Sequence, residues 1–197
     1  MNWWVNQWNN LSSMERALAL LLLSMFVFGA VGINLAATKY FFEPLSSSTL
    51  LYAFVVMMIA HKAYNLRFIT VLVFAFCVGM GVEIVGVKTG AIFGKYEYTS
   101  LLGFHLLSVP IIIGINWISL TYTTNNIAAN LIKNKAFASI FAAMAMVGFD
   151  MLIEPLAIKH KFWIWLDDGS PPIQNYISWF IVSLILSFTY QSLIDTK

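Results

Sequence analysis

Six long stretches of this sequence are apolar, and polar residues gather between them. Each stretch is long enough to cross about 30 Å of hydrocarbon as a helix that rises about 1.5 Å per residue. The second is the weakest, because its strictly apolar part, Leu50 to Ala60, is short. The six predicted spans are residues 16–37, 45–61, 67–87, 104–122, 136–158 and 176–194. The pattern therefore predicts an all-α integral membrane protein, one domain over residues 1–197, with about six transmembrane helices in hairpins.

The composition supports this fold class. Hydrophobic residues make up 60% of the 197 residues and charged residues 10%, whereas a soluble domain has about 45–50% and about 25%. A soluble monomer is excluded, because so few charges cannot cover its surface. The lone cysteine, Cys77, excludes a disulfide framework, and the scattered histidines show no metal-ligand spacing. A net charge of +2 without a basic run argues against a nucleic-acid partner.

The residues around the first span indicate an anchored chain. No basic segment precedes this span and its apolar run is long for a signal peptide, while Trp3, Trp4 and Trp8 are typical of an interfacial anchor. Six spans place both termini on one membrane face, here called side A, opposite side B. Side A carries six Lys or Arg residues (16, 62, 67, 133, 135 and 197) and side B five (39, 88, 95, 159 and 161). This count favours cytoplasmic termini of a multi-pass cell-membrane protein.

The loops of the two faces differ in character. Segments 62–66 and 123–135 on side A are predicted to be plain connectors, whereas segments 88–103 and 159–175 on side B are rich in aromatic, acidic and proline residues. We therefore expect the functional site near side B. Segment 88–103 is either a loop or a re-entrant or interfacial helix.

Three acidic residues fall inside predicted spans: Glu83, Asp150 and Glu154. An ionisable group near the bilayer centre costs at least about 2.5–3.5 kcal/mol, so such groups face a bundle interior and are functional candidates. By helical rise, Asp150 lies about 4–5 Å, Glu83 about 8 Å and Glu154 about 10 Å beyond the centre, all toward side B. This shared depth predicts one shared site.

Asp150 and Glu154 are four residues apart, so they lie on one helix face. Two carboxylates this close in a low dielectric do not both ionise readily, which predicts a general acid beside a carboxylate that acts as base or orients a water. Pro155 is expected to kink the helix beside them. The alternative is structural: the acids pair with Lys159, Asn or Tyr side chains and hold helices together.

Further polar and aromatic residues converge on the same half of the membrane. Asn residues in lipid usually bridge helices, and this reading is favoured for Asn34. His105 opens the fourth span, where a histidine is often inert. The candidate substrate-binding residues are Tyr96, Tyr98, Trp163, Trp165, Asn116, Trp117, Asn175, Trp179 and His105.

An internal repeat relates residues 67–122 to residues 136–194. Glu83 is followed at plus 13 and plus 15 by Tyr96 and Tyr98, and Asp150 at the same spacings by Trp163 and Trp165. Later spacings differ, so chance remains an alternative. The pattern predicts two parallel hairpins, each with one acid and an aromatic cover, and sites often lie at such repeat interfaces.

Acids combined with aromatic rings suit the protonation of an apolar alkene, because π-faces stabilise the resulting carbocation. The same residues resemble a known family. The string Glu83-x-x-Gly86-x-x-Thr89-Gly90-x-x-Phe93-Gly94-x-Tyr96-x-Tyr98, followed by Val109-Pro110 and Asn116-Trp117, is similar to the core of membrane carotenoid biosynthesis proteins that include carotenoid 1,2-hydratases and bisanhydrobacterioruberin hydratases. The segment from Asp150 to Trp179 resembles that family's second conserved stretch, so the resemblance covers residues 79–180.

This resemblance implies cofactor-free addition of water to the terminal isoprenoid double bond (the ψ end group) of a lycopene- or γ-carotene-like polyene. The resemblance assigns no catalytic residues; catalysis is expected from Asp150, Glu154 and Glu83 because of their depth and spacing in the predicted spans. A small membrane lycopene cyclase is one alternative, since only the fate of the cation differs. A proton-coupled carrier and an assembly scaffold are others. The exact polyene, the proton donor and the oligomeric state do not follow from the sequence.

Overall fold

The computed structural model describes residues 8–194. Long helices dominate it, as the hydropathy pattern predicts, and four short strands are added. The helices are α2 (Ser13–Asn34), α3 (Lys39–Ala60), α4 (Leu66–Thr89), α5 (Ile111–Leu131), α6 (Lys135–Lys159) and α7 (Ile173–Leu193), and a 3₁₀ turn, η1, covers Ser100–Leu102. The strands are β1 (Tyr96–Tyr98), β2 (His105–Leu106), β3 (Val109–Pro110) and β4 (Trp163–Trp165). Trp3 and Trp4 of the predicted anchor lie outside the described residues, and Trp8 is exposed.

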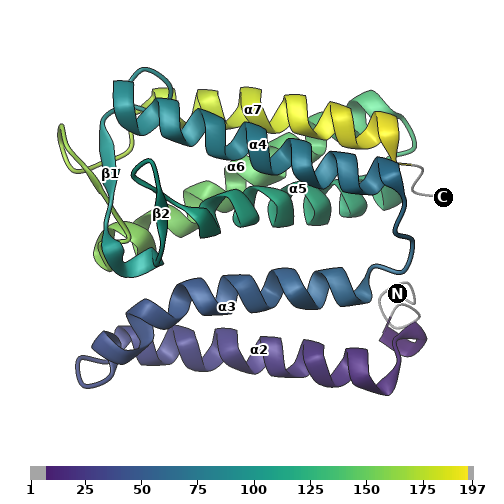
Figure 1. Ribbon diagram of the computed structural model, residues 1–197, viewed down its shortest axis with the longest axis horizontal. Helices are drawn as coiled ribbons and strands as arrows, with labels where there is room; N and C mark the ends of the chain where they lie inside the picture. Colours follow the sequence, from purple (N-terminus) through teal and green to yellow (C-terminus); the bar gives the residue numbers. More distant parts are fainter. Residues whose placement is uncertain (1–7, 195–197) are drawn as a thin grey trace. The chain divides into compact units, whose positions relative to one another are not determined.

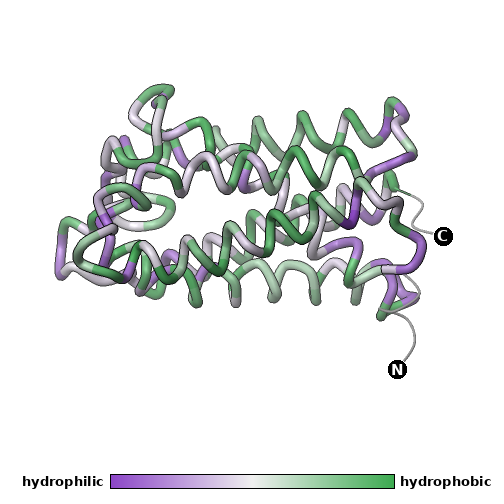
Figure 2. Tube along the Cα trace, turned by 90° about the horizontal axis from the view of Figure 1, so that it is seen from below, coloured by the Kyte–Doolittle hydropathy of each residue, from purple (hydrophilic) through white to green (hydrophobic). Residues whose placement is uncertain are grey.

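Five helices within residues 8–194 are long and apolar enough to cross a membrane: α2, α3, α4, α6 and α7. Hydrophobic residues line these helices, and hydrophilic residues gather at the connections between them (Figure 2). Large apolar side chains such as Phe28, Val73 and Ile181 are exposed, which suits helices surrounded by lipid. A multi-pass membrane protein is therefore supported, whereas the sixth predicted span is not among these helices.

The fourth predicted span, 104–122, is misplaced. Residues 105–110 form the β2–β3 hairpin, in which Leu107 and Ser108 have φ of 50° and 73°, as a tight two-residue hairpin turn requires. Helix α5 begins only after Pro110 and continues to Leu131. The segment 123–135, predicted as a plain connector, is thus largely helical.

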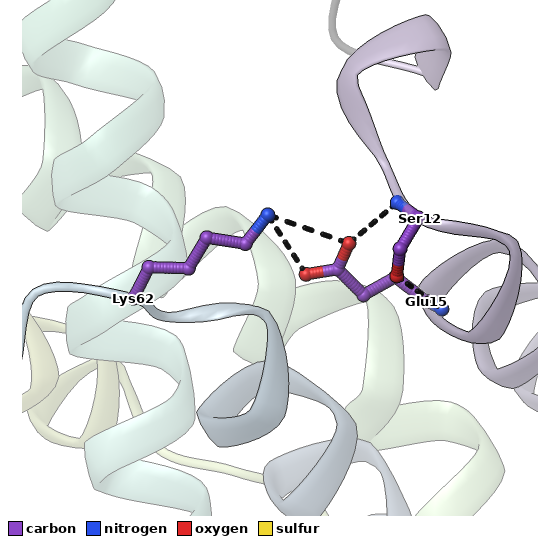
Figure 3. A network of polar contacts seen from close by, with 3 residues as sticks. All are labelled: Ser12, Glu15 and Lys62. Atoms are coloured by element: carbon purple, nitrogen blue, oxygen red, sulfur yellow. Dashed lines mark hydrogen bonds and ion pairs between the residues drawn. The ribbon is translucent and has the colours of Figure 1, made fainter.

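The chain divides into two compact units, residues 1–63 and 64–197. In the first unit, α2 and α3 pack as a hairpin. Ser12 caps α2 by accepting a hydrogen bond from the Glu15 amide, and the Glu15 carboxylate accepts one from the Ser12 amide at 2.6 Å. Lys62 Nζ lies 3.2 Å from Glu15 Oε1 (Figure 3). This contact joins the start of α2 to the residues that follow α3.

In the second unit, α4, α5, α6 and α7 form a four-helix bundle in which α7 contacts the other three helices. Strands β1 and β2 lie at one end of it (Figure 1). Two residues in the left-handed backbone conformation direct the chain from the helices into the strands at this end. Gly90 ends α4 with φ of 67°, and Lys161 follows α6 with φ of 56°, accompanied by a hydrogen bond from the Phe162 amide to Ala157 O. This is the Schellman arrangement, and it sends the chain directly into β4.

Strands β1 and β4 pair antiparallel, with Tyr96 opposite Trp165 and Tyr98 opposite Trp163. We call this pair the aromatic ribbon. The two segments predicted as side B loops, 88–103 and 159–175, are therefore joined, and the idea of a re-entrant helix over 88–103 is wrong. The fold is all-α apart from such short strands. A single domain and the repeat of 67–122 in 136–194 stay predictions.

Candidate active site beneath the aromatic ribbon

Glu83 lies on α4 and is buried, with its side chain 2% exposed. Its Oε2 accepts hydrogen bonds from the Tyr96 hydroxyl at 2.6 Å and the Tyr98 hydroxyl at 2.9 Å. Its Oε1 accepts a third from Trp117 Nε1 at 3.1 Å. Three donors from strand β1 and helix α5 therefore compensate the burial of one carboxylate.

The two tyrosines are fixed as donors. Burial and the Glu83 carboxylate raise the pKa of Tyr96 and of Tyr98 well above the ordinary value for a phenol. Both hydroxyls accordingly remain protonated at neutral pH and keep donating to Glu83.

Glycines on α4 make room for these donors. A Cβ at Gly79 would lie 2.5 Å from Trp117 Cγ, and one at Gly86 would lie 2.8 Å from Phe93 Cδ2 and 3.2 Å from the Tyr96 hydroxyl. Gly79 is one turn before Glu83 and Gly86 one turn after it, so this face of α4 places the carboxylate between two gaps. The aromatic rings can then approach the helix backbone closely.

Glu154 lies on α6 and is also buried. Its Oε1 accepts hydrogen bonds from Trp163 Nε1 at 2.8 Å and Trp165 Nε1 at 2.6 Å. The repeat aligns these tryptophans with Asp150, and this part of the prediction is wrong: their partner is Glu154. The immediate turn at Lys161 brings β4 back over the last turn of α6, closer to Glu154 than to Asp150.

The ribbon presents its four aromatic side chains to the two glutamates. Alternate residues of a strand point to the same face, so Tyr96 and Tyr98 act together, as do Trp163 and Trp165. Ring centroids lie 5.2 Å apart for Tyr96 and Trp165 and 6.1 Å apart for Tyr98 and Trp163. Glu97 and Ile164, paired on the other face, are exposed. The aromatic cover predicted for each acid is thus one shared layer.

Asp150 is buried one turn before Glu154 on α6. Its Oδ2 accepts a hydrogen bond from Asn175 Nδ2 on α7 at 3.1 Å. Within residues 8–194, Asn175 is its one hydrogen-bond donor, and Asp150 also lies close enough to Glu154 and Glu83 for electrostatic interaction. The carboxyl group of Asp150 consequently accepts the fewest hydrogen bonds of the three.

A tryptophan stack links these groups. The rings of Trp117 and Trp179 lie 4.1 Å apart and nearly parallel. Trp117 binds Glu83, and Trp179 is one turn after Asn175 on α7, so the stack connects the surroundings of Glu83 and Asp150. Ten of the predicted site residues are brought together in this way: Glu83, Tyr96, Tyr98, Trp117, Asp150, Glu154, Trp163, Trp165, Asn175 and Trp179.

Two predicted residues are not placed with them by any contact. Asn116 is half-buried on α5, next to Trp117 in the chain, and has no hydrogen bond to the three acids. His105 is in β2, where its Nδ1 lies 2.6 Å from Gly103 O. Asn34, expected to bridge helices, donates to Ala30 O of its own helix.

A second cluster of polar side chains, which was not predicted from the sequence, lies deeper in the bundle. Asn125 Nδ2 donates to Ser187 Oγ at 3.0 Å, and Gln191 Nε2 donates to Asn125 Oδ1 at 3.1 Å. The signal was present: Asn175, Trp179, Ser183, Ser187 and Gln191 recur at intervals of four along α7. No group of three His, Cys, Asp or Glu side chains in the described part of the chain is arranged to hold a metal ion.

Comparison with known proteins agrees with the resemblance seen in the motifs and extends it. No curated protein and no solved structure matches the chain. The sequence model described as "Carotenoid biosynthesis protein" matches residues 42–197, which include most of α3 and all of α4 to α7. The chain therefore belongs to the carotenoid biosynthesis protein family.

Proposed function

We propose that this protein hydrates the terminal isoprenoid double bond of a carotenoid ψ end group. Family membership supports a carotenoid as the substrate class. The observation that carries the proposal is the cluster itself: three buried carboxyl groups next to one layer of tyrosine and tryptophan rings. Acid and aromatic rings are the groups needed to form and stabilise a carbocation.

Asp150 is the proposed proton donor. Glu83 receives three hydrogen bonds and Glu154 two, whereas Asp150 receives one. Donors that point at a carboxylate stabilise its charged form. A carboxyl group with a single such donor, beside two other acids, is the best suited to carry a proton to an alkene.

The proposed step keeps atoms and charges balanced. The proton moves from Asp150 to the less substituted carbon of the terminal double bond, and the π electrons form the new C–H bond. The adjacent carbon becomes a tertiary cation, which the faces of Tyr96, Tyr98, Trp163 and Trp165 stabilise by about 0.5–2 kcal/mol per ring. Water adds to the cation and loses a proton to a carboxylate. The product is a tertiary alcohol, with one water added.

Glu154 and Asn175 are the proposed groups that orient the water. Glu154 is one turn from Asp150, and Asn175 is already held by Asp150 through its amide nitrogen. The proposed substrate is lycopene- or γ-carotene-like and enters from the bilayer, because so apolar a polyene partitions into lipid. Neither a cofactor nor a metal takes part in this step.

The test is expression of the full chain in bacteria that accumulate lycopene or γ-carotene, followed by mass-resolved chromatography of the pigments. We expect a more polar pigment that is heavier by one water. Asp150→Asn should remove at least about 99% of it, since a proton donor contributes roughly 10²–10⁴-fold. Glu97→Gln is the matched control, because Glu97 is an exposed acid on the outer face of the ribbon.

The amount of each variant in the membrane is measured by immunoblot, so that lost activity is separated from lost protein. A pigment of unchanged mass with absorption at shorter wavelength would contradict hydration and indicate a cyclase. Full activity in Asp150→Asn would contradict the assigned donor.

A further inference from the structure

Helices α5 and α7 run in the same direction through the bundle, and two of the contacts between them share one sequence offset. The Trp117–Trp179 stack and the Asn125–Ser187 hydrogen bond both join residues that are 62 positions apart in the sequence. Trp117, Thr121 and Asn125 follow one another at intervals of four on α5, as do Trp179, Ser183 and Ser187 on α7. The two helices therefore face each other in three successive levels, one helical turn apart.

The middle level is formed by Thr121 and Ser183, again 62 positions apart. Both side chains are buried, with exposed fractions of 1% and 0%. Neither hydroxyl has a hydrogen-bond partner among the described residues. In the levels on either side, the polar side chains have hydrogen-bond partners: Trp117 donates to Glu83, and Asn125 donates to Ser187.

Two buried hydroxyls without partners, facing each other from neighbouring helices, are unfavourable unless something binds both. A water molecule is the smallest ligand that donates to one and accepts from the other, and buried waters commonly satisfy polar groups in this way. We propose that Thr121 and Ser183 together bind an internal water molecule in the core of the bundle. This site lies one turn from the tryptophan stack that contacts the acid cluster.

The bound water lies close enough to the acid cluster to serve as a reactant, and this role rests on the proposed function. Hydration consumes one water per turnover inside a bundle whose surface faces lipid. A water bound one helical turn from Trp117 and Trp179 is a local supply for that step. The binding site itself requires no assumption about the reaction.

The binding site is tested first by stability in detergent. Thr121→Val and Ser183→Ala each remove one hydroxyl with little change in shape. Because one shared water needs both partners, each single variant should lower the thermal midpoint by about 2–4 °C, and the double variant by about the same amount rather than the sum. Additive effects, or unchanged or raised midpoints in both single variants, would overturn the shared site.

Ser139→Ala is the matched control. Ser139 is equally buried, but its hydroxyl donates to Lys135 O of its own helix at 2.8 Å. Its effect should add to that of Thr121→Val. An experimental structure that resolves ordered waters then separates a bridging water from a direct contact. Density within hydrogen-bond distance of both hydroxyls supports the site, and a direct Thr121–Ser183 bond or no density overturns it.

The pigment assay tests the use of the water. We expect the double variant to form hydrated pigment at least about 5-fold more slowly than the Ser139→Ala control. Coupled stability with unchanged activity would overturn the supply role and leave the binding site. A wild-type chain that yields no hydrated pigment would overturn the proposed function, while the stability and density results still decide the water site.

Discussion

The three buried acids differ in how many hydrogen bonds they receive. Glu83 has three donors, Glu154 has two and Asp150 has one within the described chain. Each donor on Glu83 or Glu154 is an aromatic side chain, whereas the donor on Asp150 is an amide. All three acids are buried, so their surroundings differ in these donors more than in burial.

Removing one aromatic donor should weaken the fold. Tyr96→Phe leaves Glu83 Oε2 without its 2.6 Å hydrogen bond. A buried acceptor that loses a partner costs about 1–3 kcal/mol, so we expect the free energy of unfolding in detergent to fall by that amount. Tyr40→Phe is the control, because Tyr40 is exposed. Equal stability of the two variants would show that the Tyr96 bond contributes nothing.

Gly79 offers a test of how closely Trp117 must approach α4. A methyl group at this position would lie 2.5 Å from Trp117 Cγ, so Gly79→Ala should displace the ring from Glu83. Overpacking of this kind costs about 1–3 kcal/mol, and we expect lower thermal stability together with reduced pigment conversion.

Gly81→Ala on the same helix is the control for Gly79→Ala. Apart from the adjoining backbone of α4, no atom lies within 4 Å of the added methyl group, and a helix is more stable with alanine than with glycine by about 0.5–1 kcal/mol. Gly81→Ala should therefore be neutral or stabilising. A destabilisation equal to that of Gly79→Ala would indicate a general effect on α4 instead of a contact with Trp117.

At the scale of elements, the aromatic ribbon organises the site. It joins strands whose central residues, Glu97 and Ile164, are 67 positions apart, and these strands follow two different helices. The ion pair of Lys95 with Asp167, at 3.3 Å, and the hydrogen bond from the Leu166 amide to Lys95 O extend the pairing beyond the strands. The ribbon thereby couples the α4–α5 connection to the α6–α7 connection.

A cysteine pair should detect the ribbon in the membrane. Glu97 and Ile164 are direct partners across the strands and point away from the acids, and opposite residues of a pair have Cβ atoms about 4.5–5.5 Å apart. In a Cys77→Ser background, Glu97→Cys with Ile164→Cys should cross-link under mild oxidation, seen as a mobility shift without reductant. Either single variant is the control, and absence of a cross-link in the pair would argue against the strand pairing.

The sequence predicts the tyrosines around Glu83 correctly but not the element that carries them. Spacings of 13 and 15 identify two residues on one face of an extended segment. However, strands of three residues are too short for alternation to be recognised between loops. The choice of Glu154 over Asp150 depends on the left-handed turn at Lys161, which an ordinary lysine does not signal. Likewise, Phe104–Val109 has the hydropathy of a helix, and only backbone geometry places a hairpin there.

At the scale of the whole molecule, the chain has two compact units, and the family match begins inside α3 and covers the unit that holds the acids. Helix α5 has 21 residues, enough for about 31 Å at the helical rise. Thr121 and Asn125 lower the mean hydropathy of α5. These polar residues are buried inside the bundle, where Asn125 donates a hydrogen bond to Ser187 of α7. A helix of this kind is recognised by its packing in the bundle rather than by its composition.

The number of crossings decides where the termini lie. If α5 crosses with the other five helices, both termini share one face, which the lysine and arginine count assigns to the cytoplasm. Reporter fusions should then give fluorescence from a C-terminal green fluorescent protein and no activity from a C-terminal alkaline phosphatase. N-terminal fusions should report the same face. Opposite faces for the two ends would mean an odd number of crossings.

The aromatic ribbon couples the solvent exposure of Glu83 and Glu154 to the hydrogen bonds that these acids accept. Strand β1 carries both phenols that hold Glu83, and β4 carries both indoles that hold Glu154. Parting the two strands would uncover the acids and strip them of these donors in the same movement. A molecule that separates β1 from β4 would therefore meet carboxyl groups that have lost their aromatic hydrogen-bond donors. Access to these acids and the loss of their hydrogen bonds are, in this architecture, one event.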